Sequence, residues 1–265
     1  MDRRASSYTE YLKITELLRL QERLSGEHDE MLFIVIHQVY ELWFREMIHE
    51  AEEIMMALRA GRIRPATRLY RRMIEIQRVL LQQVAVLETM APSEFNAFRD
   101  RLNPASGFQS SQFRELEFLS GMKEKAYLGM PGQSEGDIAR LKLRLDGPTL
   151  GEALDTVLRS RGFALPEGSL PASSPQRIEA LKTIYDDHEN HDDLFQLCEA
   201  MIEYDENFQL WRFHHVRMVE RMIGRKPGTG GSDGVGYLQK TLDKRCFPDL
   251  WSVRTHLKGG GTYGG

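Results

Sequence analysis

The chain has 265 residues, a net charge of −4 and 41% hydrophobic residues. These values predict a soluble, cytoplasmic protein of one domain with a sizeable core, and they argue against a nucleic-acid partner, which needs clustered Lys and Arg. No stretch is apolar for long enough to cross a membrane, and the two cysteines form no CxxC pattern. Membrane proteins and thiol-ligated metal proteins are therefore disfavoured.

The first 18 residues are expected to form an N-terminal arm. Tyr8, Tyr11 and Leu12 begin an amphipathic helical pattern there. Aromatic residues one turn apart on a terminal segment usually pack that segment against a protein body. The sequence leaves open whether this body is the chain's own or a neighbour's.

Residues 29–60 predict a long helix that contains the first histidine of interest. Its first half, residues 31–44, is apolar on nearly every side, which indicates a central, buried helix. Phe33 and His37 are four residues apart and share a face. His37 is then either a hydrogen-bonded core residue or part of a binding site, and the spacing alone favours the core residue.

A second helix is predicted from Pro65 towards Met90, and a shorter one begins at Pro92. In the shorter helix Phe95, Arg99 and Leu102 follow i, i+4, i+7 spacing, so a guanidinium group lies in an apolar stripe. Such an arginine needs an anion, which is either a ligand or a carboxylate elsewhere in the chain.

Residues 103–107 (NPASG) form a predicted turn after this helix. Ser106 and Gly107 could bring the backbone close to a ligand there. Further helices are expected at 109–119, 138–145 and 149–162, and residues 163–174 form a loop that we do not treat as a domain boundary.

A long helix is predicted from Ser174 through Ile202, and it contains the acidic run YDDHENHDD. By helical register, His188 and His191 of this run turn inward. A His-x-x-His pair among carboxylates could bind a divalent metal, although acidic runs are more often solvated faces.

The stretch 207–238 combines a helix with a glycine-rich segment. Trp211, His215 and Met218 recur on one apolar face, so His215 points into the core, whereas His214 lies about 100° further round on a polar edge. Six glycines between Gly224 and Gly236 then predict a loop over residues 225–238, which carries Thr229.

A single buried imidazole next to such a loop indicates a ligand site. Because no second or third ligand occurs at a metal-site interval, the pattern fits an iron porphyrin, which needs only one protein ligand below its plane.

Four blocks carry a resemblance to the tryptophan 2,3-dioxygenase family: HDEMLFIVIHQVYELWF, PSEFNAFRDRLNPASGFQS, FQLWRFHHVRMVERMIG and KPGTGGSDGVGYL. The resemblance implies an all-α helical bundle that encloses haem b, ferrous for activity, in a homotetramer with exchanged N-terminal arms. It also implies the opening of the indole pyrrole ring of L-tryptophan with O2 to give N-formylkynurenine, the first step of tryptophan catabolism by the kynurenine route.

The resemblance further implies roles around the haem. His215 would be the axial ligand of the iron, and His37 the catalytic histidine on the other side, beside the indole N–H. Phe33 would form a wall of the same pocket, and Ser106 and Gly107 would lie near the haem edge.

For the substrate, the resemblance pairs Arg99 with the carboxylate and places Thr229 at the polar end of the amino acid. Phe95 and Leu102 would line the indole side; Phe95 stands where some members carry tyrosine, so a hydroxyl contact is absent. Tyr8, Tyr11 and Leu12 would reach into a neighbouring subunit's pocket.

Two alternatives remain open. Relatives of this family act as haem monooxygenases on modified tryptophan or tyrosine in natural-product pathways, and these motifs do not separate them. A non-enzymatic haem sensor, or a plain helical oligomer, would have no need for Arg99, because a gas ligand has no carboxylate.

Overall fold

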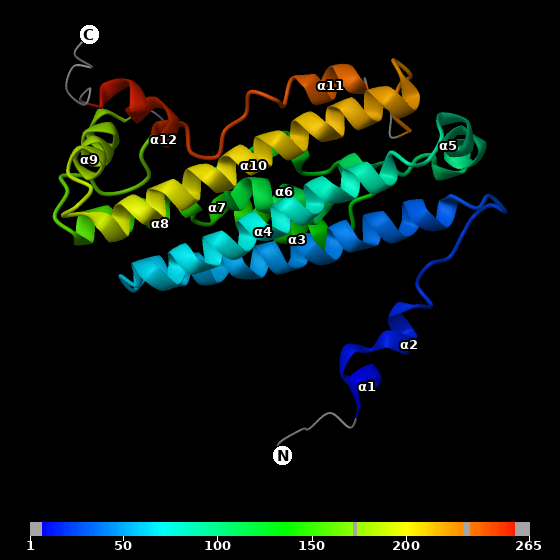
Figure 1. Ribbon diagram of the computed structural model, residues 1–265, viewed down its shortest axis with the longest axis horizontal. Helices are drawn as coiled ribbons and strands as arrows, with labels where there is room; N and C mark the ends of the chain where they lie inside the picture. Colours follow the sequence, from blue (N-terminus) through cyan, green and yellow to red (C-terminus); the bar gives the residue numbers. More distant parts are fainter. Residues whose placement is uncertain (1–6, 172–173, 230–233, 258–265) are drawn as a thin grey trace, which may run out of the picture.

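Three long helices form the body of the protein. The computed structural model describes residues 7–171, 174–229 and 234–257, and every regular element in these ranges is helical, as predicted. Helices α3 (Glu30–Arg59), α4 (Ile63–Leu87) and α10 (Asp192–Ile223) lie along one another and set the long axis of the molecule (Figure 1).

Shorter helices cover the faces and ends of this body. Helix α5 lies at one end, and α9 and α12 lie at the other, near the C-terminus (Figure 1). The shorter helices are α1 (Tyr8–Leu12), α2 (Ile14–Leu17), α5 (Pro92–Arg99), α6 (Ser111–Leu119), α7 (Glu135–Asp146), α8 (Leu150–Ser160), α9 (Pro175–Asp186), α11 (Val235–Gln239) and α12 (Pro248–Ser252). Short 3-10 turns occupy Asp100–Leu102, Gly107–Gln109, Lys125–Tyr127 and Val253–His256.

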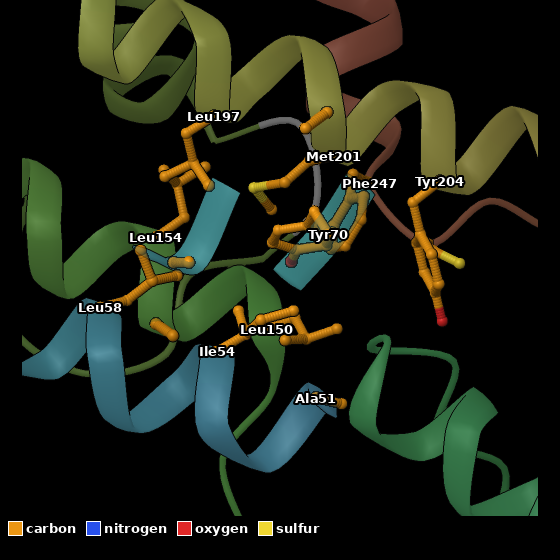
Figure 2. Packing of buried hydrophobic residues seen from close by; sticks show 14 of the residues in the cluster. Ala51, Ile54, Leu58, Tyr70, Leu150, Leu154, Leu197, Met201, Tyr204 and Phe247 are labelled. Carbon is orange, nitrogen blue, oxygen red and sulfur yellow. The ribbon is translucent and has the colours of Figure 1, made fainter. Parts of the chain in front are cut away.

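The core is densest where α3, α4, α8 and α10 meet, which we call the closed end. There Leu58, Tyr70 and Met201 are at most 1% exposed and interlock with side chains of α8 (Figure 2). Each large apolar side chain buried in this way contributes roughly 1.5–3 kcal/mol. The closed end therefore fixes the relative positions of the long helices.

The first half of α3 differs from its prediction. Residues 31–44 were expected to be buried on nearly every side, but Met31 and Val35 are each 39% exposed and Leu42 is 55% exposed. Hydrophobicity on all sides does not tell which face the chain itself covers, and this chain leaves one face uncovered.

The predicted helix 174–202 is also wrong, because it breaks between Asp186 and Asp192. Asp187 and His191 have φ angles of −129° and −121°, and α10 then continues unbroken to Ile223. Asp and Asn are poor helix formers, and acidic residues at the C-terminal end of α9 oppose the helix dipole.

The glycine-rich segment is shorter than predicted. Residues 235–239 form helix α11, so the loop ends at Gly234 rather than at Leu238. Residues 230–233 of the predicted loop lie outside the described residues.

Across the described ranges, no helix combines the length and the apolarity that spanning a bilayer requires.

Candidate functional site

A cavity of about 460 Å³ lies where the long helices approach α5, which we call the cavity end. Its wall comes from the first half of α3, from α5, α6 and the second half of α10, and from the loop after α10. All nine candidate residues outside the N-terminal arm line this cavity. They are Phe33, His37, Phe95, Arg99, Leu102, Ser106, Gly107, His215 and Thr229.

His215 is held on α10 with its ring nearly parallel to that of Trp211, at a centroid distance of 5.1 Å and an interplanar angle of 9°. Burial, together with a smaller effect of repulsion from His37, lowers the pKa of His215 to about 4. His215 is therefore neutral near pH 7. Since its ring forms no hydrogen bond with the described residues, its lone pair is available to a ligand.

His37 faces the same cavity from α3. Its Nδ1 lies 2.7 Å from the carbonyl oxygen of Phe33, and because a carbonyl can only accept, Nδ1 carries the proton. Its Nε2 is then an acceptor. Burial lowers the pKa of His37, against the opposing effects of the Phe33 carbonyl and of Glu41.

Aromatic contacts fix the wall beside His37. The ring of Phe33 lies 4.0 Å from that of His37 and 5.7 Å from that of Phe95. Phe98, 1% exposed, meets Phe95 edge to face at 5.5 Å. These contacts hold α5 against α3 and keep Phe95 turned towards the cavity.

Arg99 projects from the last turn of α5 and is half-buried. Its guanidinium group donates to the carbonyl oxygen of Pro227 in the loop. No carboxylate of residues 7–171, 174–229 or 234–257 forms an ion pair with Arg99, so the described chain gives no support to an internal salt bridge. An anionic ligand is the remaining interpretation.

The loop after α10 lies across α5 and the turn at 103–107. Thr229 Oγ1 donates to the carbonyl oxygen of Ala105 at 2.6 Å, and Lys226 Nζ lies 3.3 Å from Asn96 Oδ1. Together with the Arg99 contact, these bonds bring Thr229 and Arg99 to the same edge of the cavity.

A buried ion cluster in the cavity wall was missed by the sequence analysis. Arg114 Nη1 lies 2.6 Å from Glu117, and Arg212 Nη2 lies 2.7 Å from the other oxygen of the same carboxylate. All three side chains are at most 5% exposed and line the cavity. Two guanidinium groups share the carboxylate of Glu117. The i, i+3 spacing of Arg114 and Glu117 was the available signal, but Arg212 is distant in sequence.

The rival metal site at His188 and His191 does not form. The helix break leaves His188 exposed beside Phe195 and turns His191 towards Phe163, rather than turning both inward as predicted. Among the residues that the structure describes, no group of three or more His, Cys, Asp or Glu could hold a metal ion.

The N-terminal arm does not reach the cavity of its own chain. Helices α1 and α2 stand away from the bundle (Figure 1), and Tyr8, Tyr11 and Leu12 are 76%, 73% and 41% exposed. The described part of the chain buries none of the residues of α1.

The family model described as tryptophan 2,3-dioxygenase matches residues 1–133 and 176–257. The chain belongs to the tryptophan 2,3-dioxygenase family. The described residues of the intervening segment, 134–171 and 174–175, include α7 and α8 and contribute no side chain to the cavity. Every described residue that lines the cavity thus lies in the part that matches the family model.

Curated relatives agree over nearly the whole chain. Proteins named tryptophan 2,3-dioxygenase from Nocardioides sp., Herpetosiphon aurantiacus and Caulobacter vibrioides are 47%, 45% and 41% identical. The alignments cover 95–96% of this chain, and 94%, 99% and 98% of the respective relatives. The similarity to tryptophan 2,3-dioxygenases is therefore not confined to short motifs.

Proposed function

We propose that this protein is a haem-dependent tryptophan 2,3-dioxygenase, which opens the indole pyrrole ring of L-tryptophan with O2 to give N-formylkynurenine. One observation carries the proposal: His215, His37 and Arg99 line the same cavity from three different helices. A neutral imidazole suits a metal ligand, and a guanidinium group without a carboxylate partner in the described chain suits an amino-acid carboxylate.

The cavity fits a haem b group by the chemistry of its walls. His215 would ligate the iron, since its lowered pKa keeps the ring neutral and its stacking on Trp211 fixes the ring plane. The guanidinium groups of Arg114 and Arg212 place N–H donors in the cavity wall, and such donors suit an acidic side chain of the porphyrin. When bound, ferrous haem supplies the oxygen chemistry.

The substrate would lie between the haem and α5. Arg99 would exchange its contact with the Pro227 carbonyl for the carboxylate of L-tryptophan, which it can bind through two parallel hydrogen bonds. Thr229 would contact the polar end of the amino acid, and Phe33, Phe95 and Leu102 would hold the indole ring. These contacts position the substrate rather than react with it.

His37 would orient the indole ring. Its Nδ1 proton is held by the Phe33 carbonyl, so Nε2 is left to accept the hydrogen bond of the indole N–H. The lowered pKa favours the neutral ring, which keeps Nε2 an acceptor at neutral pH. Ser106 and Gly107 would lie at the haem edge.

We further propose that the chain acts as one domain and assembles into a homotetramer with exchanged N-terminal arms. The exposed Tyr8, Tyr11 and Leu12 support this, as does the uncovered face of α3 at Met31, Val35 and Leu42. In such an assembly the arm of one subunit would complete the pocket of its neighbour.

Product mass tests the proposed reaction. Ferrous, haem-loaded protein is incubated with L-tryptophan and O2, and we expect a product that is heavier than tryptophan by two oxygen atoms. One added oxygen atom would support the monooxygenase alternative. A protein that binds haem but leaves tryptophan unchanged would support the sensor.

Removal of the guanidinium group tests substrate binding. We expect Arg99→Ala to raise the KM for L-tryptophan by about a hundredfold, because the substrate carboxylate loses a charge-assisted partner. Arg221→Ala is the control, since Arg221 is an exposed arginine on α10 that pairs with Glu88. An unchanged KM in Arg99→Ala would make Arg99 structural.

A further inference from the structure

The two ends of the loop after α10 come close together at Lys226 and Gly234. We call this close approach the loop neck. A Cβ atom at position 234 would lie 2.7 Å from the carbonyl oxygen of Lys226, closer than such atoms approach. Gly234 also has a φ of +59°, which L side chains rarely adopt. Both facts favour glycine at this position, where the main chain of Lys226 lies close to the start of α11.

The side chain of Lys226 ties this neck to α5. Its Nζ lies 3.3 Å from Asn96 Oδ1. The amide nitrogen of Asn96 donates to the carbonyl oxygen of Pro92 at 2.6 Å, which turns Oδ1 towards the lysine. Asn96 is next to Phe95 and three residues before Arg99, so the contact joins the loop to the helix that carries both cavity residues.

The residues that follow Lys226 bring the loop to the cavity. The carbonyl of Pro227 accepts from Arg99, and the hydroxyl of Thr229 donates to Ala105. The Pro227 contact reaches α5, and the Thr229 contact reaches the turn that follows α5. The contact between Lys226 and Asn96 lies directly before them in the chain and also joins the loop to α5.

We propose that Lys226 is a positioning residue for substrate binding. Its bond to Asn96, together with the neck at Gly234, aligns the Pro227 carbonyl and Thr229 with Arg99 before the substrate arrives. This inference rests on the proposed function, since it assigns Arg99 and Thr229 to the polar end of tryptophan. Lys226 itself touches neither substrate nor cofactor.

If Lys226 had only a local structural role, its replacement would change the KM for L-tryptophan little, because an exposed polar contact contributes little to stability. A positioning role instead predicts a specific kinetic pattern. Contacts with the carboxylate and amino groups should weaken, whereas contacts with the indole ring should not. The KM for L-tryptophan, kcat and the Ki of indole, which has neither polar group, separate the two roles.

The experiment compares Lys226→Met, Lys226→Arg and Asn96→Leu in the full-length, haem-loaded enzyme. We expect Lys226→Met to raise the KM for L-tryptophan about fivefold to tenfold, with kcat and the Ki of indole changed by less than about twofold. Lys226→Arg should restore the KM, because it keeps a donor. Lys240→Met, at an exposed lysine beyond α11, is the matched control and should change nothing.

A double-mutant cycle locates the effect in the pair. Asn96→Leu should raise the KM as Lys226→Met does, and the double variant should be no worse than either single variant. An unchanged KM in Lys226→Met, or an equal rise in the Ki of indole, would overturn the inference. Wild-type enzyme that does not oxidise tryptophan would overturn the proposed function instead, so the two failures are distinguishable.

Discussion

The same helices build two different interiors at the two ends of the bundle. At the closed end, α3 contributes Leu58 and α10 contributes Met201, and apolar side chains fill the space between them (Figure 2). At the cavity end, α3 contributes His37 and α10 contributes His215, and a cavity of about 460 Å³ remains between the helices.

Buried polar side chains occur at both ends. At the closed end, the hydroxyl groups of Tyr204 and Ser120 lie 2.9 Å apart, and Gln77 donates to the carbonyl of Tyr204 at 3.1 Å. At the cavity end, His215 and the available Nε2 of His37 face the cavity. The Tyr70 hydroxyl and Gln77 Oε1, which are buried at the closed end, also have no hydrogen-bond partner among the described residues. The two ends therefore differ in the presence of a cavity rather than in how completely their polar groups are paired.

The largest expected effect is the loss of the cofactor from the cavity end. His215→Ala should abolish the Soret band of protein purified with haem, since no other side chain is expected to ligate the iron from that wall. His214→Ala is the matched control, because His214 is the preceding residue on α10 and is exposed. Normal haem loading in His215→Ala would show that another residue is the axial ligand of the iron. The proposed functional difference between the two ends would then lose its main support.

The sequence was sufficient to predict features that depend on local spacing. Intervals of three and four residues placed His37, Arg99 and His215 on apolar faces, and the structure brings all three to one cavity. The helix predicted from residue 149 forms, and it begins with a capping box in which the Thr149 amide lies 2.8 Å from the Glu152 carboxylate. The roles of the cavity residues stay predictions.

Features that depend on distant parts of the chain could not be predicted. The Arg212 ion pair with Glu117 joins residues 95 positions apart, so no periodicity reports it. The exposure of Met31 and Leu42 was missed for a related reason, since hydrophobicity does not say whether the same chain or another one covers a face. The helix break at residues 187–191, in contrast, could have been predicted locally, because Asp and Asn in this run are poor helix formers.

A pair of truncations tests the packing difference directly. We expect Leu58→Ala to lower the free energy of unfolding by about 2–5 kcal/mol, because the closed end would be left with a new void. Met218→Ala removes a side chain that already borders the cavity and should cost only about 1 kcal/mol. Urea unfolding of the haem-free protein measures both.

The same two substitutions should affect haem affinity in the opposite order to their effect on stability. Met218→Ala changes the wall of the cavity and should weaken haem binding, whereas Leu58→Ala should leave it unchanged. Equal losses of stability with equal losses of affinity would show that the two ends are not independent.

The most gradual effect is expected from pH. His215 has a pKa of about 4 in the folded chain, against about 6.5 when unfolded, so the unfolded state binds more protons between these values. Stability contributed by the neutral ring is complete above pH 6.5 and falls as the pH drops towards 4, by about 3 kcal/mol. In haem-free protein, His215→Leu should lose less stability than wild type by about this amount.

The closed end should respond at the other extreme of pH. Burial raises the pKa of Cys198 to about 12 and raises that of Tyr204 well above its usual value, so both stay protonated in the folded chain. Their contribution is complete below pH 8.5 and is lost as the pH rises and the unfolded thiol and phenol ionise. Cys198→Ala should reduce the alkaline loss and leave the acid loss intact, whereas His215→Leu should do the reverse. The measurement is the free energy of unfolding as a function of pH. If either variant altered both the acid and the alkaline loss, the two losses could not be assigned to separate ends of the bundle.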